Sequence, residues 1–382
     1  MRVAVVAEFY PRASDPVLGI WAHRQTVAAR DAGADVTAFV LHRLVPPASA
    51  FSPEEFRRLL SQPRETQPDG IPVHYVRYVS PPRGRSYARW GAWAAPALRR
   101  ALRRSGPFDL IHAHNAVPTA DAVIRCRTRL PLVVSVHGGD VLWTARDRVP
   151  GGREAVTRAL SAADLVLANS AGIAELAGEF GARRTEVVHL GTDLPPPPRA
   201  RSEDPLLVTV GHLVARKRHA DVIRALGRLP GSVRYLVIGD GPEREPLAAL
   251  ARAEGVADRV EFAGQLGHGE ALRRAREAWL FVMPSTEEAF GVAYVEAMAA
   301  GVPAIGARGE PGPAEIAAFG GGIELVAPGD PDALAALVGA LLADSGRLEA
   351  LSAAARATVV GEFTWERCGE RTVAAYGAAL GG

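Results

Sequence analysis

Two carboxylates in one short segment have a spacing that suits the binding of a sugar and of a ribose. Glu288 lies in the loop after a predicted strand that ends at Met283, where it can reach sugar hydroxyls. Glu296 lies about two turns into the helix that follows, where it can accept hydrogen bonds from a ribose diol. Taken alone, acidic residues near a helix start more often stabilise the helix dipole, so this interpretation needs support from other residues.

The first turn of the same helix is a candidate anion site. The amides of Phe290, Gly291 and Val292 have no partner within the helix, because the first amides of a helix lack a preceding carbonyl. Such amides bind phosphate groups, and a glycine permits the close approach of a ligand. We therefore expect a diphosphate at this helix start.

A second segment supplies positive charge beside the same row of strand ends. Gly211 directly follows a predicted strand, and Arg216 and Lys217 come next in the loop. Lys217 is the only lysine among 44 basic residues, which indicates that a compact ammonium is needed there. Positioned cations stabilise a diphosphate whose negative charge grows as a bond to it breaks. The alternative is a solvated basic loop, and the single lysine favours the phosphate site.

Two residues of the N-terminal half are further candidates. His137 follows a predicted strand, and its ring can donate a hydrogen bond to a bound sugar, although a histidine in this position is more often structural. Gly19, in the loop after the first strand, can offer its amide to a phosphate.

The elements that must position these residues alternate between strands and helices, which is typical of parallel sheets covered by helices. We predict strands at 2–7, 35–41, 109–113, 131–136, 164–168 and 185–190, then at 206–210, 233–238, 260–262, 279–283 and 303–305. We predict helices near 20–32, 86–104 and 153–162, with others between the later strands. Such sheets bind ligands at the carboxyl ends of their strands.

Length and proline content predict two domains. A chain of 382 residues exceeds what one hydrophobic core usually organises. Four successive prolines at 195–198 stop the alternation, since they have no amide hydrogens for a sheet. We predict an N-terminal domain over 1–192, a Pro-rich linker over 193–204, a C-terminal domain over 205–362, and a closing helix over 363–382 that packs on the N-terminal domain.

Composition excludes several classes of protein. Hydrophobic residues make up 48% and the formal net charge is +2, which argues against a disordered chain or a dedicated nucleic-acid binder. Cys126 and Cys368 alone cannot form a disulfide framework or a structural zinc site. No stretch approaches the ~20 apolar residues of a membrane span. We expect a cytoplasmic protein, with at most peripheral contact with the inner face of the membrane.

These segments, in this order, resemble the retaining, nucleotide-sugar-dependent glycosyltransferases of family GT4, which have the GT-B fold. The most specific match is Glu288 and Glu296 with Phe290-Gly291 between them, followed by the string from 296 to 303. The strings at 239–242, 328–330 and 363–365 are also similar. The resemblance covers essentially the whole chain. It implies an α/β protein with two Rossmann-like, doubly wound parallel-sheet domains that face each other across a cleft.

The resemblance also implies a role for each matching residue. Arg216 and Lys217 grip the diphosphate, Glu288 holds the donor sugar, Glu296 holds the ribose, and His137 lies near the reacting centre. Transfer would retain the anomeric configuration, with the departing phosphate helping to deprotonate the acceptor.

The sequence departs from the family pattern at two places. His212 stands where many relatives have arginine, and we expect Arg216 to supply the missing charge. The loop at 311–315 matches the family's glycine-rich donor loop only loosely.

No metal or cofactor is implied beyond the nucleotide-diphosphate sugar, which we expect to be a UDP- or GDP-sugar. Asp330 and Asp332 imitate a metal-binding pair, but Asp330 precedes a helix, where aspartate is a favourable N-cap. His112 and His114 suggest a metal pair without a third ligand, and the core or an acceptor site is the alternative.

The acceptor implied is a carbohydrate, a polyprenyl-linked compound or a natural product, and the sequence indicates little about it. The best candidate for an element that binds the acceptor is one predicted helix, which has tryptophans at its start and arginines at its end. This helix could contact a membrane or an anionic glycan. The alternative is an ordinary helix with a basic solvent face. The helix residues in question are Trp90, Trp93, Arg99, Arg100, Arg103 and Arg104.

Three other functions are compatible with this fold. They are a nucleotide-sugar epimerase, a glycosyl phosphorylase, and a non-catalytic protein that binds nucleotide sugars. A phosphorylase would need a lysine for pyridoxal phosphate, and using Lys217 for that linkage would remove it from the diphosphate. A binding protein would show affinity without turnover.

Overall fold

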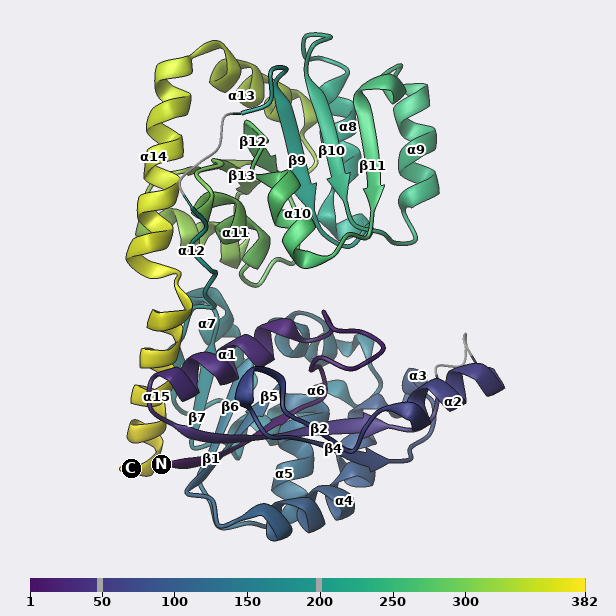
Figure 1. Cartoon of the computed structure of the whole chain (residues 1–382), viewed down its shortest axis with the longest axis vertical. Helices are drawn as coiled ribbons and strands as arrows, with labels where there is room; N and C mark the ends of the chain where they lie inside the picture. The colour runs from purple at the N-terminus through teal and green to yellow at the C-terminus, as the bar shows by residue number, and fades with distance from the viewer. Residues whose placement is uncertain (47–50, 197–200, 382) are drawn as a thin grey trace. The chain divides into compact units, whose positions relative to one another are not determined.

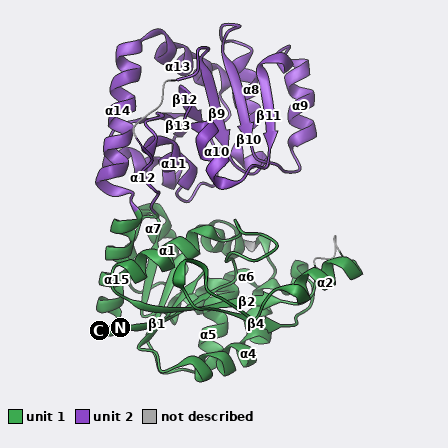
Figure 2. Cartoon of the chain, in the orientation of Figure 1, with its two compact units in different colours: residues 1–190, 365–382 green, residues 191–364 purple. Residues whose placement is uncertain are grey.

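The computed structural model describes residues 1–46, 51–196 and 201–381, and these form two compact units. Unit 1 comprises Met1–Leu190 and Trp365–Gly382, and unit 2 comprises Gly191–Thr364 (Figure 2). The predicted linker, 193–204, includes residues 197–200, which lie outside the described residues.

Unit 1 is built on an eight-stranded sheet in the order β3-β4-β2-β1-β5-β6-β7-β8 (Figure 1). Neighbouring strands are parallel except for the edge pair β3 and β4, which is antiparallel. The strands are β1 Arg2–Ala7, β2 Asp35–Arg43, β3 Glu65–Thr66, β4 Val73–Tyr78, β5 Leu110–His114, β6 Leu132–Val136, β7 Leu165–Ala168 and β8 Thr185–Val187. The central strands are buried on both faces, which explains why most of their residues are apolar.

Most helices of unit 1 connect successive strands of this sheet. The helices of this unit are α1 Ile20–Asp31, α2 Pro53–Ser61, α3 Arg83–Ser86, α4 Trp90–Ser105, α5 Asp121–Cys126, α6 Gly152–Ser161, α7 Ala171–Glu179 and α15 Trp365–Leu380. Short helical turns lie at Pro68–Gly70, Tyr87–Arg89 and Ala116–Ala120, and a ten-residue π-helical segment lies at Gly139–Arg148.

The last helix, α15, belongs to unit 1 although it is far from the rest of that unit in sequence. It runs beside α1, where its buried side chains join the core of the sheet (Figure 1). Gly369 makes this approach possible, because a Cβ there would lie 2.2 Å from the carbonyl oxygen of Ala28. Tyr376 is fully buried.

Unit 2 is built on a six-stranded parallel sheet in the order β11-β10-β9-β12-β13-β14. Its strands are β9 Leu206–Val210, β10 Arg234–Ile238, β11 Val260–Gly264, β12 Leu280–Val282, β13 Ala304–Ala307 and β14 Ile323–Val326. Its helices are α8 His219–Leu226, α9 Arg244–Ala253, α10 His268–Ala275, α11 Val292–Ala299, α12 Pro311–Phe319, α13 Pro331–Ala343 and α14 Ser345–Glu362, with short turns at Ala215–Lys217 and Ala257–Arg259.

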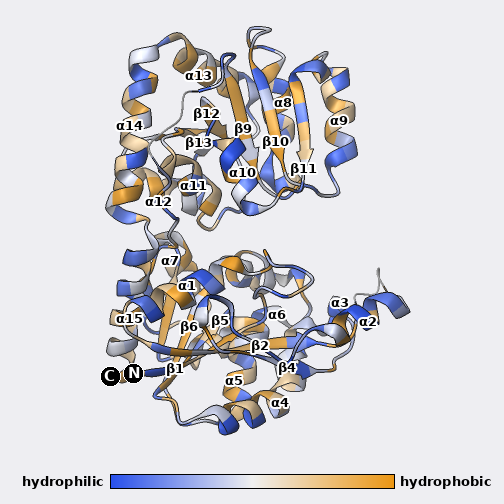
Figure 3. Ribbon diagram, viewed as in Figure 1, coloured by the Kyte–Doolittle hydropathy of each residue, from blue (hydrophilic) through white to orange (hydrophobic). Residues whose placement is uncertain are grey.

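Hydrophobic side chains from the strands and the inner helix faces form one core in each unit. Much of the hydrophobic colour in Figure 3 lies on the strands, whereas α2 and α9 carry long hydrophilic stretches. Both sheets expose the carboxyl ends of their parallel strands to the loops that carry the candidate residues, so the predicted α/β architecture is confirmed.

Candidate active site

Glu288 and Lys217 form an ion pair in unit 2. The Nζ atom of Lys217 lies 2.5 Å from Oε2 of Glu288. Both side chains are largely buried, with 12% and 10% of their surface exposed. The hydroxyl of Ser285 donates a second hydrogen bond to the same carboxylate oxygen, at 2.9 Å. The pair joins two loops, one after β9 and one after β12.

The surroundings of Glu288 keep it ionised. Burial alone would raise its pKa, but the charge and hydrogen bond of Lys217, with help from Arg216 and Ser285, lower the pKa below its ordinary value. A carboxylate with such partners can accept hydrogen bonds from sugar hydroxyls at neutral pH.

The backbone holds the two loops together. The amide of Thr286 donates to the carbonyl of Arg216 at 2.8 Å. Arg216 itself is exposed, and its side chain has no hydrogen bond or ion pair to any other described residue. Its guanidinium is therefore available to an anion beside Lys217.

Gly291 gives the start of α11 its shape. Its φ of 84° lies in the left-handed region, and a Cβ would stand 2.4 Å from the ring of Tyr294. No other described residue accepts a hydrogen bond from the amide of Gly291 or Val292. These two amides match the predicted anion site. Phe290 is 1% exposed, so its side chain serves the core.

Glu296 occupies a different environment from Glu288. Burial raises its pKa to about 7, and the nearby negative charge of Asp193 adds to the effect. Its carboxylate lies 3.7 Å from Nε2 of His268. The group is therefore poised between its two protonation states near neutral pH.

Gly211 serves the fold of its loop. Its amide donates to the carbonyl of Ile238 at 2.9 Å and is therefore not available to a ligand. What Gly211 can give a ligand is the space left by its missing side chain. A Cβ on Gly239 would lie 2.0 Å from the carbonyl oxygen of Gly211, and one on Gly241 would lie 2.5 Å from that of Leu213. The glycines of the 239–242 turn therefore permit close packing against the loop. His212 is exposed.

His137 of unit 1 belongs to a group of three histidines. Its Nε2 atom lies 3.0 Å from Nδ1 of His114, and the two rings are almost parallel at an angle of 4°. The Nδ1 atom of His137 is buried and has no hydrogen-bond partner within the described residues. Burial lowers the pKa of His137 to about 4, so the ring is neutral at pH 7. A neutral ring with one nitrogen occupied has only Nδ1 left for a ligand.

His112 and His114 are core residues, each 1% exposed. His112 bonds to the hydroxyl of Ser135 at 2.7 Å and to that of Tyr376 at 2.8 Å. Within residues 1–46, 51–196 and 201–381, no group of three or more His, Cys, Asp or Glu side chains is arranged to hold a metal ion. Asp330 caps α13, where its side chain accepts from the amide of Ala333.

Gly19 begins α1 with a φ of 64°. A Cβ at this position would lie 2.1 Å from the carbonyl carbon of Phe9. The loop after β1 is therefore folded back tightly on itself, and only glycine fits there.

Sequence reasoning did not predict the supporting roles of three residues. Ser285 binds Glu288, His114 binds His137, and Glu310 accepts a hydrogen bond from the amide of Glu288 at 2.9 Å. Ser285 and Glu310 lie in loops that follow strands, which was an available signal, but their partners depend on the folded chain.

The helix proposed for acceptor contact is α4, and its two tryptophans differ. Trp90 is buried and donates from Nε1 to the carbonyl of Pro81, whereas Trp93 is 52% exposed. Among the described helices, none combines the length and the hydrophobicity that a membrane crossing requires.

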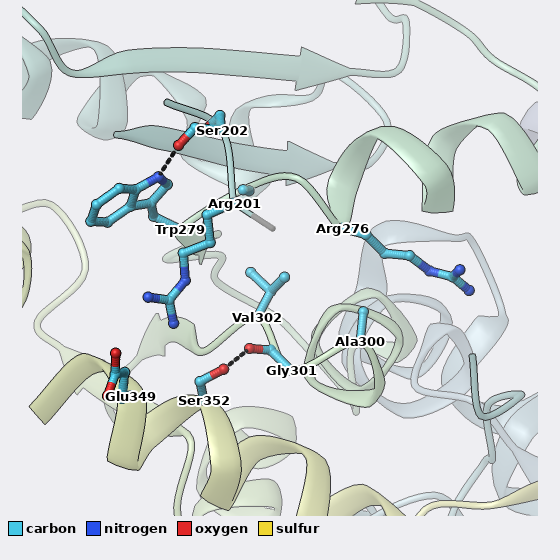
Figure 4. A pocket seen from close by; sticks show the side chains of 10 residues that line it. Arg201, Ser202, Arg276, Trp279, Ala300, Gly301, Val302, Glu349 and Ser352 are labelled. Atoms are coloured by element: carbon cyan, nitrogen blue, oxygen red, sulfur yellow. Dashed lines mark hydrogen bonds between the residues drawn. The ribbon is translucent and has the colours of Figure 1, made fainter. Parts of the chain in front are cut away.

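Figure 4 shows a pocket of about 460 Å³ in unit 2 that contains none of the predicted site residues. It lies at the amino ends of the strands, beside Trp279 and Val302. Trp279 donates from its indole nitrogen to the carbonyl of Ser202, and the hydroxyl of Ser352 donates to that of Gly301 (Figure 4). This pocket is separate from the edge that carries Lys217 and Glu288.

Comparison with known families gives matches over both units. The model described as Glycosyltransferase Family 4 matches residues 18–195, and that described as Glycosyl transferases group 1 matches residues 192–358.

Individual relatives agree with these matches. D-inositol 3-phosphate glycosyltransferase 1 of Catenulispora acidiphila is 30% identical, with 82% of each chain covered. The putative teichuronic acid biosynthesis glycosyltransferase TuaC of Bacillus subtilis is 26% identical, with 80% of each covered.

Solved structures share the fold over the whole chain. Sucrose-phosphate synthase from Thermosynechococcus elongatus is similar with a TM-score of 0.80 at 19% identity, covering 100% of this chain and 99% of that one. Anabaena HepE in complex with UDP-glucose has a TM-score of 0.73 at 20% identity, covering 99% and 100%.

Proposed function

Because the chain belongs to glycosyltransferase family 4, we propose that it takes a sugar from a UDP- or GDP-sugar and transfers it with retention of the anomeric configuration. The acceptor is a carbohydrate, a polyprenyl-linked compound or another small natural product. No metal takes part in the proposed reaction.

The observation that carries this proposal is the Lys217–Glu288 pair beside the free amides of Gly291 and Val292. The ammonium and the amides suit a diphosphate, and the carboxylate suits sugar hydroxyls. A donor of the nucleotide-diphosphate-sugar class has both groups, because its diphosphate is attached to the anomeric carbon of the sugar. Glu296, farther along α11, can then accept hydrogen bonds from the hydroxyls of the ribose.

The proposed step breaks the bond between the anomeric carbon and the phosphate oxygen. The acceptor oxygen forms a new bond to that carbon on the same face, and its proton passes to the departing phosphate. Lys217 and Arg216 stabilise the charge that develops on the diphosphate. Glu288 orients the sugar, His137 donates to it from Nδ1, and Gly19 offers its amide to the phosphate.

Related proteins support the donor class. HepE was solved with UDP-glucose and with UDP and glucose. A mannosyltransferase of Mycolicibacterium smegmatis, 31% identical over 63% of this chain, is described as GDP-mannose-dependent. The two bases are therefore the first to test.

The test is a thermal-shift screen of UDP-, GDP-, ADP- and dTDP-sugars with EDTA present. A ligand that binds the folded state raises its stability by RT ln(1 + [L]/Kd), so the correct donor should raise the melting temperature without a metal. The selected donor is then incubated with acceptors of the three classes, and the anomeric configuration of the product is read by proton NMR.

Retention at the anomeric carbon is the expected result. An inverted product would contradict the proposed stereochemistry. A donor shift that requires a divalent ion would contradict metal independence, and the absence of any shift together with the absence of donor hydrolysis would contradict the donor class.

A further inference from the structure

A basic cavity of about 420 Å³ lies in unit 1, between the edge of the sheet and the C-terminal half of α4. This half of α4 leads to the amino end of β5. Neither Gly19 nor His137 lines this cavity. The residues that shape it include Arg64, Glu65, His74, Arg77, Arg100 and Arg104.

The spacing of residues on α4 gives the cavity its form. Ala97 and Ala101 are four positions apart and line it together with Arg100 and Arg104, which have the same spacing. Residues four apart lie on the same face of a helix. The small alanines leave room between α4 and β4, and the two arginines border that room.

Positive charge in the cavity is not neutralised by the protein. Four guanidinium groups line it, against the single carboxylate of Glu65, which faces Nδ1 of His74 at 3.3 Å. Arg64, Arg100 and Arg104 make no ion pair and no side-chain hydrogen bond with any other residue in the described ranges. Like charges gathered around one space repel each other, so an anion there would relieve the repulsion.

Part of the lining is fixed before any ligand arrives. The Nη2 atom of Arg77 donates to the carbonyls of Leu60 at 2.9 Å and of Gln62 at 2.7 Å. Its Nε atom is buried without a hydrogen-bond partner among the described residues. The ring of His74 is stacked on Phe39 with centroids 5.3 Å apart.

We propose that this cavity binds a phosphoryl group through Arg64, Arg100 and Arg104. Guanidinium groups bind phosphate oxygens with paired hydrogen bonds. The phosphoryl group is either a free phosphate ion or part of a lipid headgroup, and both present the same oxygens. This site is independent of the donor site and of the proposed function.

The test compares two double variants that lose the same charge. Arg100→Gln/Arg104→Gln removes the two helix cations of the cavity. The control, Arg103→Gln/Arg129→Gln, removes two arginines that do not line the cavity. Arg103 lies toward Cys126, where burial raises the thiol pKa to about 11 and the arginine opposes that rise. Arg129 is exposed.

Inorganic phosphate is titrated into each full-length protein by calorimetry. Phosphate can also occupy the donor site, so each protein is measured with and without Lys217→Ala. The cavity variant should bind phosphate about five- to tenfold more weakly than the parent, since two exposed charge contacts are lost. The control should change by less than about twofold.

Equal weakening in the two double variants would overturn the proposal, because it would show only a general effect of charge. The same holds if the parent and the cavity variant bind phosphate equally. Sedimentation with phosphatidylglycerol vesicles, against phosphatidylcholine vesicles, then identifies the source. Vesicle binding that Arg100→Gln/Arg104→Gln abolishes assigns the site to a lipid headgroup, and phosphate binding without vesicle binding assigns it to a free ion.

Discussion

Lys217 and Glu288 show how a buried ion pair can be ready for a ligand. Each side chain is mostly removed from water, and a buried charge without a partner is costly. In the unliganded chain each neutralises the other. A bound donor would bring new partners for the Lys217 ammonium and the Glu288 carboxylate. Until the donor binds, the ion pair keeps both groups charged.

His114 is a positioning residue for His137 in our proposal. We expect His114→Ala to lower turnover about tenfold, because the His137 ring loses the hydrogen-bond partner that orients it. The KM for the donor should change little. Nitrogen-15 NMR should show that His137 no longer has a single tautomer.

His112→Ala is the matched control for that variant. His112 is equally buried but bonds to Ser135 and Tyr376 instead. It should lower stability without changing the His137 tautomer. If both variants alter His137 and turnover to the same extent, His114 has no specific positioning role.

At the scale of elements, the loop between β1 and α1 depends on close backbone contact at Gly19. We expect Gly19→Ala to destabilise unit 1 by more than about 3 kcal/mol, because the new Cβ would overlap the backbone of Phe9 in addition to the strain of a left-handed residue. Urea unfolding measures this difference.

Gly33→Ala separates the effect of backbone strain from the effect of the contact with Phe9. Gly33 also has a positive φ, of 102°, but nothing lies within 4 Å of the position of a Cβ. Gly33→Ala should lower the free energy of unfolding by only about 1 kcal/mol. Equal costs in the two variants would show that the contact with Phe9 does not matter.

The helix α11 carries a carboxyl group whose protonation should affect nucleotide binding. Burial and Asp193 raise the pKa of Glu296 to about 7, so its contribution to stability is present at acidic pH and is lost as the pH rises through about 7. The ionised form accepts from a ribose diol more strongly. We therefore expect affinity for the nucleoside diphosphate to increase between pH 6 and pH 8.

Calorimetric titration of the nucleotide at several pH values tests this, with Glu296→Gln as the control. That variant keeps an acceptor oxygen but cannot titrate, so it should lose most of the pH dependence that remains after the phosphate groups are accounted for. An unchanged pH profile in Glu296→Gln would contradict the assignment.

The elements also show what could be predicted from sequence. The strand predicted at 2–7 corresponds to β1, because five β-branched or small apolar residues in a row suit a strand buried on both faces. The strands β3, β4 and β14 were not predicted, and β3 has only two residues. In β4, His74 and Arg77 interrupt the apolar pattern, and β14 has only four residues after a run of glycines.

Sequence patterns could identify Lys217 and Glu288 one by one but not as a pair. They are 71 positions apart, and no local periodicity links two loops that follow different strands. The same limit applies to His114, whose role depends on the neighbouring strands β5 and β6. The helix α2 was not predicted, although Phe56, Leu59 and Leu60 have the spacing of one helix face. None of its residues is buried, so this face has no core to cover it within the described residues.

At the scale of the whole molecule, the chain leaves unit 1 after Leu190 and returns to it at Trp365. Truncation after Thr364 would remove α15 and with it Cys368, Ala375 and Tyr376 from the core of unit 1. We expect β1 and α1 to lose protection from hydrogen exchange, because their apolar contacts and the partner of His112 are lost.

Hydrogen exchange measured by mass spectrometry distinguishes the two units in one experiment. Peptides from β9 and β10 should keep their protection, since the core of unit 2 contains no residue of α15. Unchanged protection in β1 and α1 would show that α15 contributes nothing to the stability of unit 1.

The most direct test of the central claim is the release of nucleoside diphosphate from the preferred donor, compared between the parent enzyme and Lys217→Ala. Loss of one preorganised charge-stabilising donor typically costs ~3 kcal/mol, so turnover should fall by about two orders of magnitude while circular dichroism shows a folded protein. Arg228→Ala, an exposed cation of the same unit, should retain the parent rate. Equal rates in a folded Lys217→Ala enzyme and its parent would contradict the proposed donor site.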